Sequence, residues 1–319
     1  MLGTGRITRR LVADLQATDG VSVSAIASRD RQRATWFAEQ YGIATGVAGY
    51  ANLLQRDDVD GVYIALPPSL HTQWTLAAAA AGKHVLCEKP IATNAADARS
   101  MLDACSQQGV RFLDATGWLH HERTAAFRAG LDARRFGTIG HISTAVSFFR
   151  PFQSDEHRLD PALGGGCLLD LGWYAFGLPI WVAGLPSRVF ASAVMEQGVD
   201  LRITAMLWWA DGTSGCVSCG YDTASRKWFE VAGSDASLIC DDFTRPWPDR
   251  PARCWIHRAS GEVESESFAG HQEHAMIRFW IGGESLAGHH RRILLTQRVL
   301  EAAKASVASR KPVEIEADG

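Results

Sequence analysis

The first third of the chain alternates short apolar runs with stretches of helical periodicity. The apolar runs are nearly continuous, as expected for strands buried on both faces of a parallel sheet. These predicted strands lie at 21–27, 59–66, 84–87 and 110–113. The predicted helices between them lie at 31–41, 73–81 and 95–108. Alternation at this spacing predicts a parallel sheet with right-handed crossovers.

Polar residues and glycines mark the ends of these helices. Asp30 and Asn94 stand where a helix N-cap is expected, because their side chains accept hydrogen bonds from the first turn. Gly42, Gly82 and Gly109 stand where the helices should end.

After about residue 117 the pattern changes to strand-like runs separated only by turns. Several of them alternate polar and apolar positions, which predicts an antiparallel sheet with one covered face. These runs lie at 142–149, 189–195, 201–210, 215–221, 227–232, 237–241 and 253–258. We therefore expect an α/β domain over 1–117 and a separate α+β domain, with a large, mostly antiparallel open sheet, over 118–319.

Composition narrows the class of protein. The chain has 319 residues, 46% of them hydrophobic and 21% charged, which is typical of a globular protein that buries a core. A net charge of −3 gives no basis for a nucleic-acid partner. The longest nearly apolar stretch, 175–185, is too short to cross a bilayer, and the N-terminus has no signal-peptide pattern. Seven cysteines without dense spacing fit a cytoplasmic protein with reduced thiols.

A glycine motif opens the chain. Gly3-Thr4-Gly5 precedes Arg6, Ile7 and a helix-like stretch through Gln16. Two glycines allow a tight turn and close approach to a pyrophosphate at a helix N-terminus. The third fingerprint glycine is replaced by Thr8, so an ordinary glycine turn is the alternative. Its place at the start of a βαβ series favours a dinucleotide-binding domain.

The end of the next predicted strand bears on which dinucleotide binds. A carboxylate there would bind the ribose hydroxyls of NAD, whereas an arginine accommodates the 2′-phosphate of NADP. Ser28 and Arg29 offer a hydroxyl and a guanidinium, and Asp30 is better used as the helix cap. We therefore expect NADP, with NAD as the alternative; Arg29 could also be merely exposed to solvent.

Glu88, Lys89 and Pro90 directly follow the predicted strand 84–87. Ligands bind at the carboxyl ends of the strands in an open α/β sheet. Lys89 could therefore hydrogen-bond a substrate hydroxyl or the nicotinamide ribose, while Pro90 fixes the turn.

A glycine-rich segment, 164–166, leads into a predicted helix of the second domain as a flexible entry. On that helix Asp170 and Tyr174 are four residues apart and share one face. A carboxylate beside a phenol can act as a proton-transfer pair, with Asp170 orienting Tyr174. The alternative is a buried tyrosine that has found a hydrogen-bond partner.

A histidine and a pair of cysteines are further candidate site residues. His120 could line the substrate site or take a packing role. Cys216 and Cys219 lie three apart in a strand-like run and so face opposite sides, which argues against a metal pair, and we predict no metal site.

Together these motifs resemble the glucose–fructose oxidoreductase, inositol dehydrogenase and rhizopine-catabolism (Gfo/Idh/MocA) family over essentially the whole chain. The resemblance rests on residues 3–7, 27–29, Pro67-Pro68 with His71, Glu88-Lys89-Pro90, and 164–174. It implies a Rossmann domain and an oxidoreductase that acts on sugars, cyclitols or diols. It also implies cofactor contacts at Gly3, Thr4, Gly5, Arg6, Ile7, Ser28, Arg29, Pro67, His71, Glu88 and Lys89.

The resemblance also suggests a substrate class and an assembly. Tyr174 stands where many members have histidine, which together with residues 158–161 is similar to the aldose and dihydrodiol dehydrogenase branch. This favours aldoses, anhydro-sugars and trans-diols. We expect Tyr174 to move the hydroxyl proton and Lys89 to lower its pKa and position the substrate oxygen. A homo-oligomer through the second domain's sheet is expected. An NAD-dependent glycosidase and a non-catalytic regulator remain as alternatives.

The start of the chain is unusual for a dinucleotide fold. A strand of about five residues should lead into the first glycine. Only Met1 and Leu2 precede Gly3. We therefore expect a truncated first strand, and weaker NADP binding than in a form with an apolar N-terminal extension.

Overall fold

The chain forms two compact units in a computed structural model that describes residues 1–149, 151–153, 156–246 and 250–316. The first unit contains Met1–Thr116 and Glu273–Ile293; the second contains Gly117–Gln272 and the chain from Leu294 onward. The sequence interpretation placed all of 118–319 in the second domain. The structure places 273–293 in the first unit because Met276, Ile277 and Trp280 are buried in its core.

The first unit contains short parallel strands in two hydrogen-bonded groups. One group pairs β1 with β2, and the other has the order β3-β4-β5. The strands are β1 (Ala25–Ser28), β2 (Thr45–Ala48), β3 (Gly61–Ile64), β4 (His84–Cys87) and β5 (Phe112–Asp114). Their largely buried residues agree with the continuous apolar runs in the sequence.

Leu2 joins these two groups of strands. It forms parallel bridges to Ala27 on one side and to Ile64 on the other. Its amide donates to the Tyr63 carbonyl at 2.8 Å, and its carbonyl accepts from the Ala65 amide at 2.9 Å. Leu2, which is fully buried, therefore takes the place of a first strand, and the order β2-β1-Leu2-β3-β4-β5 is that of a doubly wound dinucleotide fold.

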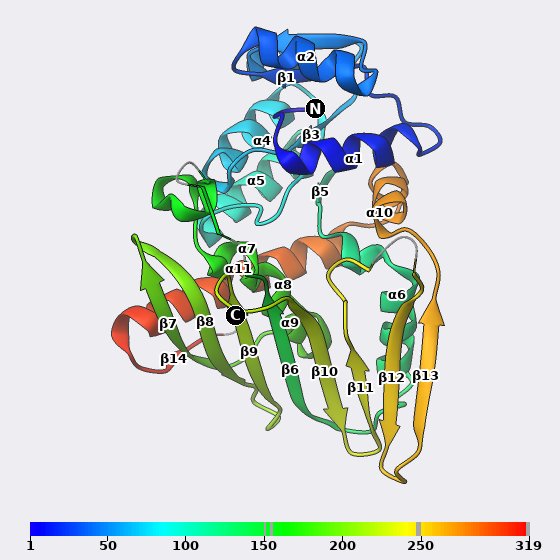
Figure 1. The fold of residues 1–319 in the computed structure, drawn as a ribbon, viewed down its shortest axis with the longest axis vertical. Helices are drawn as coiled ribbons and strands as arrows, with labels where there is room; N and C mark the ends of the chain where they lie inside the picture. The colour runs from blue at the N-terminus through cyan, green and yellow to red at the C-terminus, as the bar shows by residue number, and fades with distance from the viewer. Residues whose placement is uncertain (150, 154–155, 247–249, 317–319) are drawn as a thin grey trace. The chain divides into compact units, whose positions relative to one another are not determined.

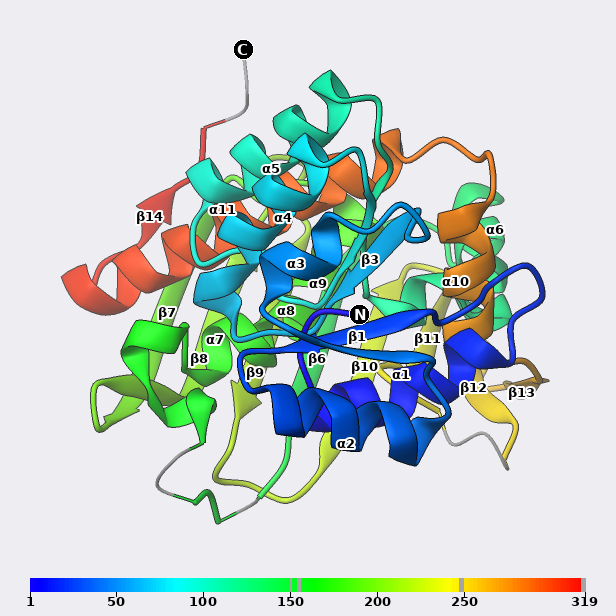
Figure 2. The same ribbon diagram turned by 90° about the horizontal axis from the view of Figure 1, so that it is seen from above.

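Helices cover both faces of these strands. In Figure 2, α1 and α2 lie on one side of the strands, with α4 and α5 on the other. The helices of this unit are α1 (Arg6–Gln16), α2 (Arg31–Tyr41), α3 (Tyr50–Leu54), α4 (His71–Ala80), α5 (Ala95–Gln107) and α10 (Gln272–Ile281), with the start of α11 (Ala287–Ser309). The predicted caps are confirmed: Asp30 accepts from the Arg33 amide, Asn94 accepts from the Asp97 amide, and Gly42 ends α2 in the left-handed conformation.

Some elements differ from the prediction. Strand β1 begins only at Ala25, and β2 and α3 were not predicted. The strand β2 has a glycine because a Cβ at Gly46 would lie 2.6 Å from backbone atoms of α2. Such a short, half-buried strand has no apolar run by which a sequence could reveal it.

The second unit is built on one nine-stranded sheet (Figure 1). Its order is β13-β12-β11-β10-β6-β9-β8-β7-β14, and neighbouring strands in the described chain are antiparallel except the parallel pair β6 and β9. The strands are β6 (Ile139–Ser147), β7 (Arg188–Glu196), β8 (Val199–Trp208), β9 (Ser214–Gly220), β10 (Arg226–Gly233), β11 (Ala236–Cys240), β12 (Ala252–Arg258), β13 (Val263–Phe268) and β14 (Val313–Glu314). The predicted mostly antiparallel sheet is confirmed.

Helices pack on one face of this sheet. Contacts with β6, β8 and β9 come from α7 (Cys167–Asp170), α8 (Gly172–Ala175) and α9 (Gly177–Ala183), and α6 (Glu122–Asp132) packs near β13. The stretch 161–183, which contains α7 to α9, is long and apolar enough to pass as a membrane span among the described residues. The most apolar part of this stretch is 67% buried inside the protein, as in the core helix of a globular unit.

Candidate functional site

The glycine motif forms a turn that only glycine can make at its first position. Gly3 has a φ of +102°, and a Cβ there would lie 2.4 Å from the Ala65 carbonyl oxygen. Gly5 is the N-cap of α1 and supplies no side-chain cap. The N-terminus of α1 therefore has no side-chain cap, as at a helix that receives a pyrophosphate. We call residues 3–5 the glycine turn.

An arginine outside the motif holds the glycine turn in place. Arg33, in the first turn of α2, donates from Nε to Thr4 Oγ1 at 2.7 Å and from Nη2 to the Thr4 carbonyl at 3.1 Å. Arg33 was not predicted from the sequence, because nothing in its local pattern points to a residue 29 positions earlier.

The predicted NADP-selecting residues lie at the end of β1, where Ser28 is the last residue of the strand and Arg29 follows it. Ser28 is buried, and its hydroxyl accepts from the Asp30 amide at 3.3 Å, whereas Arg29 is exposed. Burial raises the pKa of Tyr50, and the charges of Arg29 and Arg33 oppose that rise, so both guanidinium groups act on this phenol. Two arginines beside a phenol after the strand suit a 2′-phosphate.

The Glu88–Pro90 turn directly follows β4 and is held by contacts with the neighbouring strand. Glu88 Oε1 accepts from the Tyr63 hydroxyl at 2.6 Å, and the Glu88 amide donates to the Ile64 carbonyl at 2.9 Å. Both contacts reach β3, and the Lys89–Pro90 peptide is cis. Lys89 itself is half-buried. Its backbone is therefore fixed from the neighbouring strand.

His71 connects two turns at this edge. Its Nδ1 lies 2.8 Å from the Pro90 carbonyl and its Nε2 lies 2.7 Å from the Leu66 carbonyl. The ring is 1% exposed. His71 therefore braces the turn that begins at Pro67 against the Glu88–Pro90 turn, a structural contribution that the sequence prediction of a cofactor contact did not include.

All predicted cofactor residues of the first unit thus lie at the carboxyl ends of its strands or just beyond them. The glycine turn follows Leu2, Ser28 and Arg29 follow or end β1, and Glu88 and Lys89 follow β4. Pro67 precedes the short 3₁₀ turn at Pro68–Leu70, and Arg6 and Ile7 begin α1 with exposed side chains. The space that only Gly3 leaves and the uncapped α1 fit a dinucleotide.

The glycine-rich segment of the second unit is packed tightly. A Cβ at Gly165 would lie 2.7 Å from the Arg158 carbonyl oxygen, and one at Gly166, where φ is +107°, would lie 2.4 Å from Asp200 Oδ1. The predicted flexible entry is therefore wrong. The glycines are there because the chain from 158 and the Asp200 carboxylate approach the backbone closely.

Asp170 belongs to a partly buried cluster of four polar side chains. Its Oδ2 accepts from Arg158 Nε at 2.6 Å and from the Tyr221 hydroxyl at 2.9 Å, and Arg158 Nη1 lies 3.0 Å from Glu156 Oε1. We call Glu156, Arg158, Asp170 and Tyr221 the Asp170 cluster. The charge of Asp170 raises the pKa of Arg158, and burial together with Asp170 raises the pKa of Tyr221. Tyr221 therefore stays protonated and donates to Asp170.

The predicted single helix through Asp170 and Tyr174 is divided. Helix α7 ends at Asp170 and α8 begins at Gly172, although Leu171 between them keeps helical dihedral angles. Tyr174 is half-buried, and its amide donates to the Leu171 carbonyl. His120 is half-buried at the end of the 3₁₀ turn Gly117–His120 in the same unit. These three predicted residues belong to the second unit, and the cofactor residues belong to the first.

Comparisons with known proteins cover nearly the whole chain. Residues 1–115 match the model of an oxidoreductase family with an NAD-binding Rossmann fold, and residues 124–239 match the GFO/IDH/MocA C-terminal domain. The chain is 34% identical to D-xylose 1-dehydrogenase (NADP(+)) 2 of Haloferax volcanii, over 84% of this chain and 82% of that protein. It is 35% identical to a dTDP-3,4-didehydro-2,6-dideoxy-alpha-D-glucose 3-reductase of Streptomyces violaceoruber, over 80% and 75%.

A solved structure is similar throughout. The 3-ketoreductase of Actinomadura kijaniata, in complex with NADP and TDP-benzene, superposes with a TM-score of 0.89 at 29% identity over 96% of both chains. Solved variants of that reductase replace a tyrosine by phenylalanine or a lysine by glutamate or alanine.

These findings confirm the predicted fold class, oxidoreductase class and NADP cofactor, and they give the glycosidase alternative no support. The chain therefore belongs to the GFO/IDH/MocA family of oxidoreductases.

Proposed function

We propose that this protein is an NADP-dependent dehydrogenase or reductase whose substrate is an aldose, an anhydro-sugar, a trans-diol or a related ketosugar. The observation that carries this proposal is the Glu88–Pro90 turn, which Tyr63 and His71 hold at the strand edge expected for the reacting end of a cofactor. The relatives named for xylose and for a dTDP-linked ketosugar support a sugar as the substrate.

In this proposal the residues of the first unit bind the cofactor. The glycine turn, Arg6 and Ile7 approach the pyrophosphate, Ser28 and Arg29 bind the 2′-phosphate, and Pro67, His71 and Glu88 shape the nicotinamide end. NADP, when bound, exchanges hydride with the reacting carbon. Lys89 positions the substrate oxygen and favours its deprotonated form, because a nearby cation stabilises a developing negative charge.

Tyr174 moves the hydroxyl proton, and Asp170 and His120 shape the substrate side. Asp170 positions rather than reacts, since Arg158 and Tyr221 occupy its carboxylate. Solved variants of the Actinomadura reductase replace a tyrosine in one case and a lysine in another. They support the choice of Tyr174 and Lys89 as the residues to test in this chain.

A substrate panel tests the proposal. Aldoses, anhydro-sugars, trans-diols and nucleotide-linked ketosugars are assayed by nicotinamide absorbance, each with NAD and with NADP. We expect net cofactor turnover with at least one class and a preference for NADP. A protein that binds NADP but turns over no member of the panel, in either direction, would contradict the proposal.

We also propose that copies of this chain assemble through the nine-stranded sheet of the second unit, at its β7 side. Phe190 and Val194 lie four residues apart on β7 and are 39% and 41% exposed, so this strand offers adjoining apolar surface to a second copy. Light scattering after size exclusion tests this: Phe190→Glu with Val194→Glu should yield monomers, and an unchanged mass would contradict it.

A further inference from the structure

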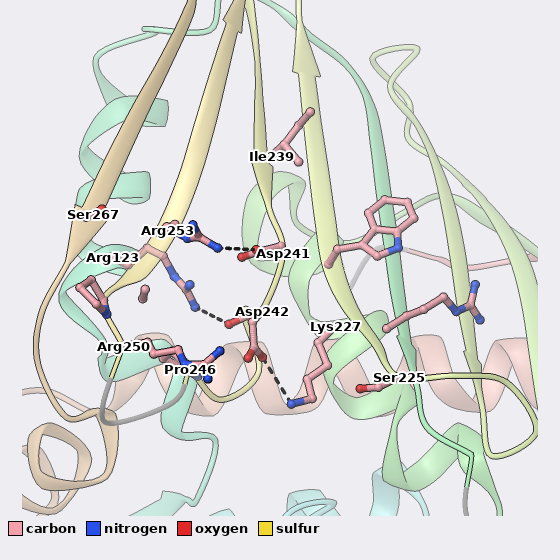
Figure 3. Close-up of a pocket in the computed structure, with 14 residues that line it drawn as sticks. Arg123, Ser225, Lys227, Ile239, Asp241, Asp242, Pro246, Arg250, Arg253 and Ser267 are labelled. Carbon is pink, nitrogen blue, oxygen red and sulfur yellow. Dashed lines mark hydrogen bonds and ion pairs between the residues drawn. The ribbon is translucent and has the colours of Figure 1, made fainter.

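A large hollow lies in the second unit, at one end of its sheet. Strands β10 and β12 begin there and β11 ends there, so neighbouring antiparallel strands bring their polar end residues together (Figure 3). Its volume is about 1020 Å³, enough for an organic molecule rather than a single small ion. None of the residues proposed above for cofactor binding or catalysis lines it.

Positive charge dominates this hollow. Five of its lining side chains are cationic and two are carboxylates, whereas the whole chain carries a net charge of −3. The carboxylates are weakly engaged, with Lys227 Nζ 3.5 Å from Asp242 Oδ1 and Arg253 Nη2 3.8 Å from Asp241 Oδ2. Three positive charges are therefore left for an anion. We call this site the cationic hollow.

A buried arginine in its wall has unused donors. Arg123, at the start of α6, is 1% exposed, and its Nη2 donates to the carbonyls of Asp242 and Phe243 at 3.0 and 3.2 Å. Its Nε and Nη1 have no hydrogen-bond partner within the described part of the chain. Buried guanidinium groups normally have all their donors paired, because unpaired ones cost free energy.

The remaining cations have neutral or distant partners. Arg226 donates from Nε to the Ser147 hydroxyl at 2.9 Å and from Nη2 to the Ser218 hydroxyl at 3.2 Å. Arg253 also lies over the ring of Trp255, at 5.5 Å from its centroid. These side chains are thus held in place without being neutralised, which is how a preformed anion site is built.

We propose that the cationic hollow binds the phosphoryl group of a phosphorylated organic molecule. Guanidinium and ammonium groups around one space favour a multiply charged oxyanion over a single carboxylate. Trp228 and Ile239 also line the hollow and offer apolar surface to the organic part of such a ligand. The proposal concerns the second unit alone and does not depend on which sugar reacts.

Calorimetric titration of the full chain tests this proposal. The protein is first saturated with NADP so that the cofactor's own phosphate contacts are occupied, and is then titrated with thymidine diphosphate, glucose 1-phosphate or inorganic pyrophosphate. We expect saturable binding that weakens as sodium chloride is added, because salt screens the attraction. Comparing the three probes tells a nucleotide from a sugar phosphate and from a free anion.

Matched variants locate the site. Lys227→Gln and Arg253→Gln each remove one exposed or half-exposed cation and should weaken binding about tenfold, the loss of one charge-assisted hydrogen bond. Lys304→Gln, the same change on an exposed residue of α11, should leave the affinity unchanged. Arg123→Gln should weaken binding more, provided that its circular dichroism is native.

Two results would overturn the proposal: no saturable binding of any probe at millimolar concentration, or equal affinities in the wild type, Lys227→Gln and Arg253→Gln. Both can be read without a turnover assay. A failure here therefore remains distinct from a failure of the proposed oxidoreductase function.

Discussion

The glycine turn of the first unit and the Asp170 cluster of the second are built in different ways. The glycine turn depends mainly on backbone packing: Leu2 pairs with strands on both sides, and Gly3 leaves room that any Cβ would fill. Arg33 adds side-chain contacts to Thr4. The Asp170 cluster is made of side chains, which come from 156, 158, 170 and 221. A region held by backbone packing should lose stability when a methyl group is added. A region held by side-chain contacts should lose stability when one partner is removed.

Among changes in the first unit, Lys89 should show the largest effect, because it is the one side chain of that unit proposed to act on the substrate. Lys89→Ala should lower kcat/KM about 10³-fold while NADP affinity stays close to that of the wild type. Steady-state kinetics and a fluorescence titration measure the two. Lys83→Ala is the control, since Lys83 precedes β4 and its Nζ donates to the Arg56 carbonyl. Equal losses in both variants would refute the role of Lys89.

Gly3→Ala tests whether backbone packing holds the glycine turn. The added Cβ would meet the Ala65 carbonyl oxygen at a position where φ is +102°, so unfolding should become easier by about 3 kcal/mol. Gly42→Ala, where φ is +64° and nothing lies within 4 Å, should cost about 1 kcal/mol. Denaturant unfolding measures both. If the two variants are equally stable, the close approach at Gly3 does not restrict the residue.

Arg158→Met tests whether side-chain contacts hold the Asp170 cluster. It leaves the mostly buried Asp170 without its main cationic partner and should destabilise the protein by about 2 kcal/mol, less than for a fully buried pair because Arg158 is 29% exposed. Arg202→Met breaks the more exposed pair with Asp222 and should cost under about 1 kcal/mol. A larger loss for Arg202→Met, measured by thermal unfolding, would show that the Asp170 cluster contributes little.

Arg29 should show the smallest effect, because its side chain is exposed. Arg29→Ala should raise the Kd for NADP about tenfold and leave the Kd for NAD unchanged, since only NADP carries the 2′-phosphate. Arg31→Ala, also exposed and two residues on, serves as the control. If Arg29→Ala weakens NAD and NADP equally, Arg29 does not select between the cofactors.

The same difference explains how much could be predicted from the sequence. The residues of the first unit that follow strands could be found because an apolar run, a turn and a helix cap are neighbours in the sequence. This is why β4 and the caps Asp30 and Asn94 were predicted correctly. The partners Arg33 of Thr4 and Tyr221 of Asp170 were missed because each lies in a different element, 29 and 51 residues away.

Packing between segments that are far apart in the sequence also could not be predicted from local patterns. Helix α10 joins the core of the first unit although more than 150 residues of the second unit lie between them in the sequence. The tight packing of Gly165 and Gly166 likewise depends on Arg158 and Asp200, which no spacing rule brings to this segment. Three glycines in a row therefore suggested flexibility where the structure has close contact.

The most direct test of the account is the turnover of Tyr174→Phe on the substrate that the panel identifies. Removing only the hydroxyl should lower kcat by about 10²- to 10⁴-fold, because the proton then lacks its carrier, while the Kd for NADP stays unchanged. Tyr41→Phe, on α2 of the first unit, is the matched control and should keep its full rate. A Tyr174→Phe protein as fast as the wild type would contradict the claim that Tyr174 moves the proton.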